Sequence, residues 1–133
     1  ADAVGSRFPG ARRATFADLR EMGYGSLEGV RMADIGGEIK AVSERWKGGD
    51  VAHRVGGDEG ESPQDVADRA MAVLRHIVDA HAGGVVLLVC HAWVNKAIIA
   101  SLSPTLGLSQ LQDVPQRNCA VNVLDVRGRG GGG

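Results

Sequence analysis

The sequence predicts an α/β fold, an α/β/α sandwich with a largely parallel sheet. The first observation is an unbroken apolar run at 85–90, which lacks the alternation of a strand with one face in water, so both faces should be buried. The second is helix-like periodicity before and after that run. The third is an alternating apolar stretch at 120–126. Helix, strand, helix and strand in this order are typical of such a sandwich.

Length and charge limit the classes of protein that the chain can belong to. A chain of 133 residues suits one globular domain, and a net charge of -1 creates no field that would attract nucleic acid or an anionic membrane. No apolar run is long enough to span a bilayer, and the first residues lack a secretory pattern. We therefore expect an intracellular protein, cytoplasmic unless an organelle transit peptide lies upstream.

The first third of the chain predicts little regular structure apart from one helix. Residues 1–14 mix Gly, Pro, Arg and Ser without periodicity, which predicts a loop or a truncated edge. A short extended segment at 15–22 is a doubtful strand. Apolar residues at helical spacing predict a helix at 30–46, although Gly36-Gly37 weakens its middle and can split it. A glycine-rich, charged loop follows at 47–60.

The clearest predicted helix begins after Ser62. Ser62 is a suitable N-cap, Pro63 suits the first helical position, and Asp65 lies within reach of the cap. Apolar residues then recur at helical spacing, and Gly83 is a typical C-terminal stop. These signals predict a long amphipathic helix that ends just before the apolar run.

The last third predicts one more helix and one more strand. The helix spans about 92–102 and is stopped by the Ser-Pro pair that follows it. A loop at 114–118 leads to the strand at 120–126, and the glycine-rich tail at 127–133 should be flexible. Only two strands are convincing, whereas such sheets usually have four or more. The domain is therefore predicted to be truncated at its N-terminal side.

The two cysteines indicate neither a metal site nor a disulfide framework. Cys90 and Cys119 lie beside or inside predicted strands, without further Cys or His at metal-binding spacing. We therefore expect two buried thiols, no bound metal and no cofactor.

His91 is the strongest candidate functional residue. It follows the apolar run directly, which places it at the carboxyl end of a buried strand. Open α/β sheets bind ligands there, where the next helix presents unpaired N–H groups to an anion. A structural histidine that satisfies a backbone carbonyl is the alternative, but the position at a strand end favours a functional role.

A second candidate lies in the glycine-rich stretch 19–29, which carries Glu21 and Glu28. A carboxyl group in such a loop can be a general acid if an apolar wall raises its pKa. A solvated side chain is the alternative for both. Glu61 is explained by helix capping, and Arg69 by a surface or bridging charge.

Together these segments resemble the histidine phosphatase superfamily, the phosphoglycerate mutase-like enzymes. The resemblance covers nearly the whole stretch from 19 to 126, within a partial domain at 15–126. Its pieces are Leu19-Arg20-Glu21 with Gly25 and Leu27-Glu28-Gly29, Gly60-Glu61-Ser62 with Asp65-Val66 and Arg69, Leu88-Val89-Cys90-His91, and Asn118-Cys119-Ala120-Val121. The resemblance implies a phosphoglycerate mutase-like α/β/α sandwich.

The resemblance also implies a reaction: two-step phosphoryl transfer through a phosphohistidine. His91 is similar to the family's second histidine, which stabilises the phosphoryl oxygens, and Glu21 to the residue that protonates the leaving oxygen. Ala92 and Asn118 match substrate-binding positions. The implied substrate is a phosphorylated small molecule such as a sugar phosphate, and the implied scheme needs no metal or cofactor.

The main departure from the family is the missing nucleophile. The family carries it in an Arg-His-Gly motif, which is absent from these 133 residues. Arg75-His76 is no substitute, because it lies inside the long predicted helix, where His76, like His53 and His81, is expected to be structural or solvent-facing. A second departure is Ala92-Trp93, where the family commonly has glycine; Trp93 can narrow the pocket or pack under a missing segment.

Several functions therefore remain open. We favour a fragment of a phosphomonoester phosphatase, inactive by itself because it lacks the nucleophile. A phosphoglycerate mutase-type phosphotransferase is one alternative, and a non-catalytic phosphate-binding or structural module is another. A serine or cysteine hydrolase with His91 as base is disfavoured, since the sequence has no nucleophile-elbow pattern. The sequence does not predict the oligomeric state.

Overall fold

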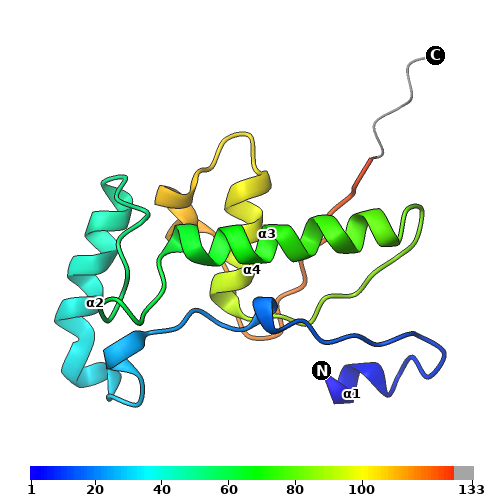
Figure 1. The fold of residues 1–133 in the computed structure, drawn as a ribbon, viewed down its shortest axis with the longest axis horizontal. Coiled ribbons are helices and arrows are strands. Elements are labelled where there is room, and N and C mark those ends of the chain that lie inside the picture. The colour runs from blue at the N-terminus through cyan, green and yellow to red at the C-terminus, as the bar shows by residue number, and fades with distance from the viewer. Residues whose placement is uncertain (128–133) are drawn as a thin grey trace.

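The structure, a computed structural model, describes residues 1–127, and the regular elements of this part are all helices, joined by long irregular segments (Figure 1). Its α-helices are α1 (Asp2–Gly5), α2 (Met32–Lys47), α3 (Pro63–Ala80) and α4 (Ala92–Leu102). Three short 3-10 helices, η1 (Ala17–Leu19), η2 (Gly25–Leu27) and η3 (Leu108–Asp113), lie in the connections. None of the α-helices in the described part is long and apolar enough to cross a membrane.

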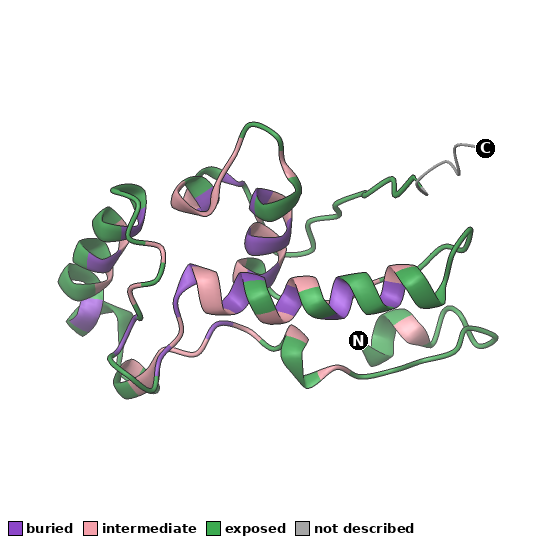
Figure 2. Cartoon of the chain, turned by 45° about the horizontal axis from the view of Figure 1, so that its top comes forward, coloured by how far each residue is buried: buried purple, intermediate pink, exposed green. Residues whose placement is uncertain are grey.

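Helix α3 begins where the sequence predicts and forms the centre of the structure. The Ser62 side chain accepts a hydrogen bond from the Asp65 N–H, and the Asp65 carboxylate accepts one from the Ser62 N–H. Pro63 takes the first helical position, and Gly83 lies just beyond the end with a φ of +74°. A stripe of buried residues runs along the helix (Figure 2): Val66, Ala67, Ala70, Val73, Leu74 and Ile77. The predicted cap and stop are confirmed.

The hydrophobic core lies where α3, α4 and the end of α2 meet. Helix α4 packs against α3, and its residues Val94 and Ala97 are fully buried. Helix α2 contributes Val42 and Trp46. Its 16 residues are continuous, so Gly36-Gly37 does not split the predicted helix. Two interior glycines cost about 1 kcal/mol each relative to alanine, which the burial of the apolar face of α2 outweighs.

The predicted buried strand at 85–90 is not formed. This segment has no regular secondary structure, and its odd-numbered side chains face solvent, with Val85 101% and Leu87 62% exposed. Leu88 and Cys90 pack against the core instead. Within residues 1–127, no backbone group of 85–90 bonds to another backbone group. A strand depends on a neighbouring strand for those bonds, and the described residues supply none here.

The second predicted strand, 120–126, is also unpaired and exposed, with Val123 at 87%. In the described residues the one β-type pairing is an isolated bridge between Tyr24 and Gly60. The predicted parallel sheet is therefore not confirmed in the part of the chain that the structure describes. Apolar and β-branched composition favoured strands here, but strand pairing depends on partners distant in sequence.

The N-terminal segment lies outside the hydrophobic core. Residues 1–14, predicted as a loop, contain the short helix α1, in which no residue is buried. The chain then approaches α3, where the Phe16 ring contacts His76 edge-on at 6.1 Å. His76 is exposed on α3, so the structure places it away from the core. Apart from Arg127, the predicted tail at 127–133 lies outside the described residues.

Candidate functional site

The structure brings Glu21 to the N-terminus of α4. One carboxylate oxygen of Glu21 accepts hydrogen bonds from the N–H groups of Met22 at 3.0 Å and Trp93 at 3.2 Å. The second oxygen lies 3.4 Å from the same Trp93 N–H. Trp93 is the second residue of α4, and His91 is its N-cap. The Glu21 carboxylate and His91, 70 positions apart in the sequence, therefore lie at the same helix end.

His91 sits at this helix end with an extended backbone and an exposed side chain. Its carbonyl accepts the first helical hydrogen bond, from the Asn95 N–H at 3.0 Å. Its imidazole makes no hydrogen bond to another described residue. Ala92, the first residue of α4, is also exposed. The ring and the helix terminus are therefore accessible to a ligand.

The contacts of Glu21 are those of a hydrogen-bond acceptor. Both donors are backbone N–H groups, and one belongs to the helix N-terminus that suits a phosphoryl oxygen. A general acid must instead donate a proton. One oxygen of a carboxyl group can accept a hydrogen bond while the other carries a proton, so these contacts leave the second oxygen for that role. A phosphoryl group that binds this helix end would compete with Glu21 for the Trp93 N–H.

Aromatic side chains form one wall beside this carboxylate. The Trp93 indole N–H donates to the Tyr24 hydroxyl at 2.9 Å, and the Trp93 ring meets Trp46 edge-on at 5.7 Å. The Lys96 ammonium lies 5.3 Å from the Trp93 ring centre. Trp93 thus packs towards α2 and the loop of Tyr24. Tyr24 was not predicted as a site residue, although its place between two glycines near Glu21 was a usable signal.

Burial raises the pKa of the Tyr24 hydroxyl above its ordinary value. Its pKa is raised by burial and by the charges of Glu21 and Glu28, against which the hydrogen bond from Trp93 acts. At neutral pH the hydroxyl keeps its own proton while it accepts the indole N–H. Tyr24 can therefore donate a hydrogen bond to an anion at this site.

The two cysteines differ in their surroundings. Burial, together with the charge of Glu21, raises the pKa of the Cys90 thiol, so it stays protonated at neutral pH and is a weak nucleophile. Cys119 is exposed, with a φ of +60°, so the prediction of a buried thiol is wrong there. It lies in a turn between extended segments that pair with no strand in the described part of the chain.

Asn118, the remaining sequence-predicted site residue, is not joined to this site by any hydrogen bond in the described structure. It is exposed in the same turn as Cys119. Its proposed role in substrate binding stays a prediction.

Glu61 and Arg69 form a nearly buried ion pair next to the Glu21 loop, with side chains 13% and 10% exposed. Burial by itself would raise the pKa of the Glu61 carboxyl. The hydrogen bonds from Arg69 and the Gly23 N–H, together with the charges of Arg69 and Arg20, outweigh burial and lower it. Capping does not explain Glu61, since Ser62 and Asp65 cap α3. The sequence analysis recognised a bridging charge at Arg69 but not its partners.

This pair makes stability depend on pH. A carboxyl whose pKa is lower in the folded than in the unfolded chain stabilises the fold fully above the unfolded value, here the ordinary 4.5. The stabilisation is lost as pH falls from there through the lowered folded pKa. We expect the free energy of unfolding, measured with urea, to fall between about pH 6 and about pH 3, and to fall less in Glu61→Gln. An equal fall in Glu61→Gln would contradict the role of this carboxyl.

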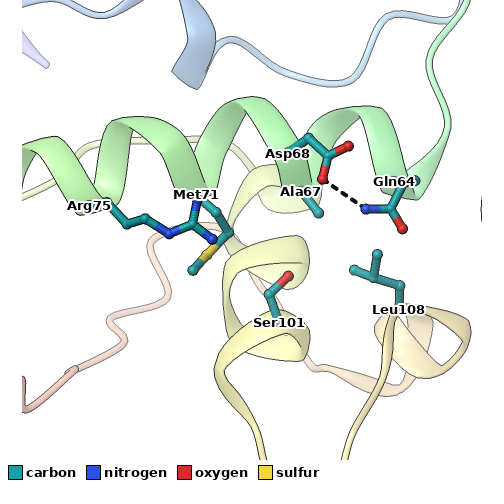
Figure 3. Close-up of a pocket in the computed structure, with 7 residues that line it drawn as sticks. All are labelled: Gln64, Ala67, Asp68, Met71, Arg75, Ser101 and Leu108. Atoms are coloured by element: carbon teal, nitrogen blue, oxygen red, sulfur yellow. Dashed lines mark hydrogen bonds between the residues drawn. The ribbon is translucent and has the colours of Figure 1, made fainter.

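A separate hollow lies on the other side of α3 and has a volume of about 330 Å³ (Figure 3). Neither Glu21 nor His91 lines it. Gln64 and Asp68 are hydrogen-bonded across its rim at 2.8 Å, and Arg75 extends along it. Among the described residues no group of three or more His, Cys, Asp or Glu side chains is placed to hold a metal ion.

Comparison with known proteins identifies related phosphatases. The family model of the histidine phosphatase superfamily (branch 1) matches residues 2–132. A 2-carboxy-D-arabinitol-1-phosphatase of Triticum aestivum is 30% identical over 116 residues, which are 86% of this chain and 22% of that protein. A metal-independent phosphoserine phosphatase of Arabidopsis thaliana is 32% identical over 111 residues, 83% of this chain and 44% of that protein. The chain thus spans less than half of either relative. No solved structure gives a significant match.

Proposed function

The chain belongs to the histidine phosphatase superfamily. We propose that it is the part of a phosphomonoester phosphatase that supplies the general acid and the second histidine of the active site. One observation carries the proposal: the Glu21 carboxylate is hydrogen-bonded to the Trp93 N–H, at the N-terminus of the helix that His91 caps. A proton carrier, an imidazole and a helix N-terminus are thereby brought to one place. These are the groups that phosphoryl transfer uses to neutralise charge and protonate a leaving oxygen.

In this proposal the phosphoryl group binds at the N-terminus of α4. The N–H groups of Ala92 and Trp93, together with the His91 imidazole, donate to its oxygens and stabilise the charge that develops on them. Glu21 has left Trp93 and gives its proton to the leaving alcohol oxygen. It then takes a proton from the water that releases the phosphoryl group.

The nucleophile in this proposal is a histidine of an Arg-His-Gly motif, which this chain does not contain. Its imidazole nitrogen forms a bond to phosphorus as the bond from phosphorus to the alcohol oxygen breaks. Water then attacks phosphorus and breaks the P–N bond, which yields inorganic phosphate and the free imidazole. Without that motif, the 133-residue chain by itself is proposed to be inactive.

The proposed substrate is a phosphorylated small molecule. The names of the two relatives describe such substrates, a carboxyarabinitol phosphate and phosphoserine. Both relatives are named as phosphatases. Hydrolysis is therefore preferred to mutase chemistry.

The test is hydrolysis of 4-nitrophenyl phosphate by the chain alone and by a fusion of the chain to a segment that carries Arg-His-Gly. We expect turnover only by the fusion. Glu21→Gln and His91→Ala should each lower its kcat by about 10²-fold or more. His76→Ala, an exposed histidine of α3, is the matched control and should leave kcat unchanged.

Two outcomes would contradict the proposal. Turnover by the bare chain that His91→Ala abolishes would make His91 the nucleophile. A folded fusion that binds inorganic phosphate without turnover would instead favour the non-catalytic module.

A further inference from the structure

Arg69 of α3 holds the backbone on the N-terminal side of Glu21. Its side chain donates to both Glu61 carboxylate oxygens, at 2.7 and 2.9 Å. It also donates to three backbone carbonyls, those of Asp18 at 2.6 Å, Arg20 at 2.8 Å and Glu21 itself at 3.2 Å. All three nitrogens of the guanidinium are thus in use, on a side chain that is 10% exposed.

Glu61 holds the backbone on the other side of Glu21. Its carboxylate accepts the Gly23 N–H at 2.8 Å, and its own N–H donates to the Gly23 carbonyl at 2.9 Å. The Arg20 guanidinium adds a third partner, 3.0 Å from the same carboxylate. Peptide groups before and after Glu21 are therefore bonded to one ion pair.

This ion pair connects the Glu21 loop to the helix that follows His91. Arg69 belongs to α3, and α3 packs against α4, at whose N-terminus the Glu21 carboxylate meets Trp93. The Glu21 loop is thus connected to α4 in two ways: through the ion pair and α3, and through the Glu21 carboxylate itself. A shift of the loop relative to α3 would move the Glu21 carboxylate away from α4.

We propose that Arg69 and Glu61 are positioning residues, which fix the Glu21 loop so that its carboxyl group reaches the N-terminus of α4. This inference deepens the proposed function and rests on it for its relevance to catalysis. Neither side chain touches substrate in it. The positive charge of Arg69 alone would not hold the loop, because three of its hydrogen bonds go to backbone carbonyls in different directions. A guanidinium has several donors spread widely enough to reach all three, whereas an ammonium group is a compact point charge.

The test reads the position of the Glu21 carboxyl in the 133-residue chain by NMR. In the wild type, Glu21→Gln should change the resonance of the Trp93 backbone amide proton, because that amide donates to the Glu21 carboxylate. This change, the Trp93 shift, is then measured in each variant by comparing the chain with and without Glu21→Gln. Arg69→Lys keeps the charge but loses most of the backbone contacts, so we expect the Trp93 shift to fall about twofold or more.

The matched control is Arg54→Lys. Arg54 also pairs with a carboxylate near the start of α3, Asp65, and donates to one backbone carbonyl, that of Asp58. Its contacts do not include the Glu21 loop, so the Trp93 shift should keep its wild-type size. A purely stabilising role for Arg69 would leave the two variants alike at Trp93.

Glu61→Gln provides a second variant should Arg69→Lys fail to fold. It keeps an acceptor for the Gly23 N–H but removes the charge that holds Arg69, so the Trp93 shift should again fall. If Arg69→Lys or Glu61→Gln folds and still shows a Trp93 shift of wild-type size, the inference is wrong. This readout needs no turnover, so it fails or succeeds separately from the proposed function.

In the Arg-His-Gly fusion, the same positioning role predicts that Arg69→Lys lowers kcat about 10-fold to 100-fold with little change in KM. A change in KM alone would point to substrate binding and contradict it.

Discussion

Trp46→Ala should lower the free energy of unfolding by about 3–5 kcal/mol, the typical effect of removing a buried tryptophan ring. Trp46 is 2% exposed at the end of α2, and its ring contacts Trp93. Its indole N–H donates to the His53 carbonyl at 2.7 Å. Truncation removes the packing between α2 and the start of α4, and with it one wall of the candidate site. Urea unfolding followed by circular dichroism measures the loss.

Trp46→Phe is the matched variant, because it keeps a smaller aromatic ring while it removes the indole N–H and part of the ring volume. The His53 carbonyl then loses its partner, which should cost about 1–3 kcal/mol. The difference between the two variants therefore reports the packing of the aromatic ring that Phe keeps and Ala removes. Equal losses in Trp46→Ala and Trp46→Phe would show that the ring contributes little to the core.

Gly56→Ala should lower the free energy of unfolding by about 2–5 kcal/mol, from left-handed backbone and steric overlap together. Gly56 has a φ of +69°, and an added Cβ would lie 1.8 Å from the Tyr24 carbonyl oxygen. The Gly56 carbonyl also accepts the Ser26 N–H at 3.0 Å. The clash would separate this loop from the segment that contains Tyr24.

Gly57→Ala is the control for this prediction, since the two glycines differ in their surroundings. Gly57 has a similar φ of +81°, but nothing lies within 4 Å of the position of its Cβ. We expect only the backbone penalty of about 1–2 kcal/mol there. Thermal or urea unfolding of both variants gives the difference, and equal losses would mean that the contact with Tyr24 does not constrain the loop.

The helices were predictable because their signals are local. The capping box of α3, its proline and the stop after it all lie within a few residues of the helix ends. The end of α4 at Leu102 was equally predictable from the Ser103-Pro104 pair that follows it. Helical hydrogen bonds connect residues four apart, so a short stretch of sequence contains both partners.

The candidate site was predictable only in part. His91 was predicted from the end of an apolar run interpreted as a strand, which is not formed, and Glu21 from a glycine-rich loop. The family resemblance supported both residues, but the partners of Glu21 were not predicted. Nothing in the sequence near Arg69 indicates that it bonds to the carbonyl of Glu21, 48 residues away. Contacts of this kind depend on how α3 packs against the rest of the chain. The arginine side chain is long enough to reach many different acceptors, so its position in the sequence does not indicate which ones it bonds.

The sequence by itself determined where α3 and α4 begin and end, and to which family the chain belongs. Tertiary structure alone decided that 85–90 and 120–126 remain unpaired in the described residues, and that the Glu21 carboxylate lies at the N-terminus of α4. The reason is physical. A helix satisfies its own backbone, whereas strands and sites are completed by groups far away along the chain.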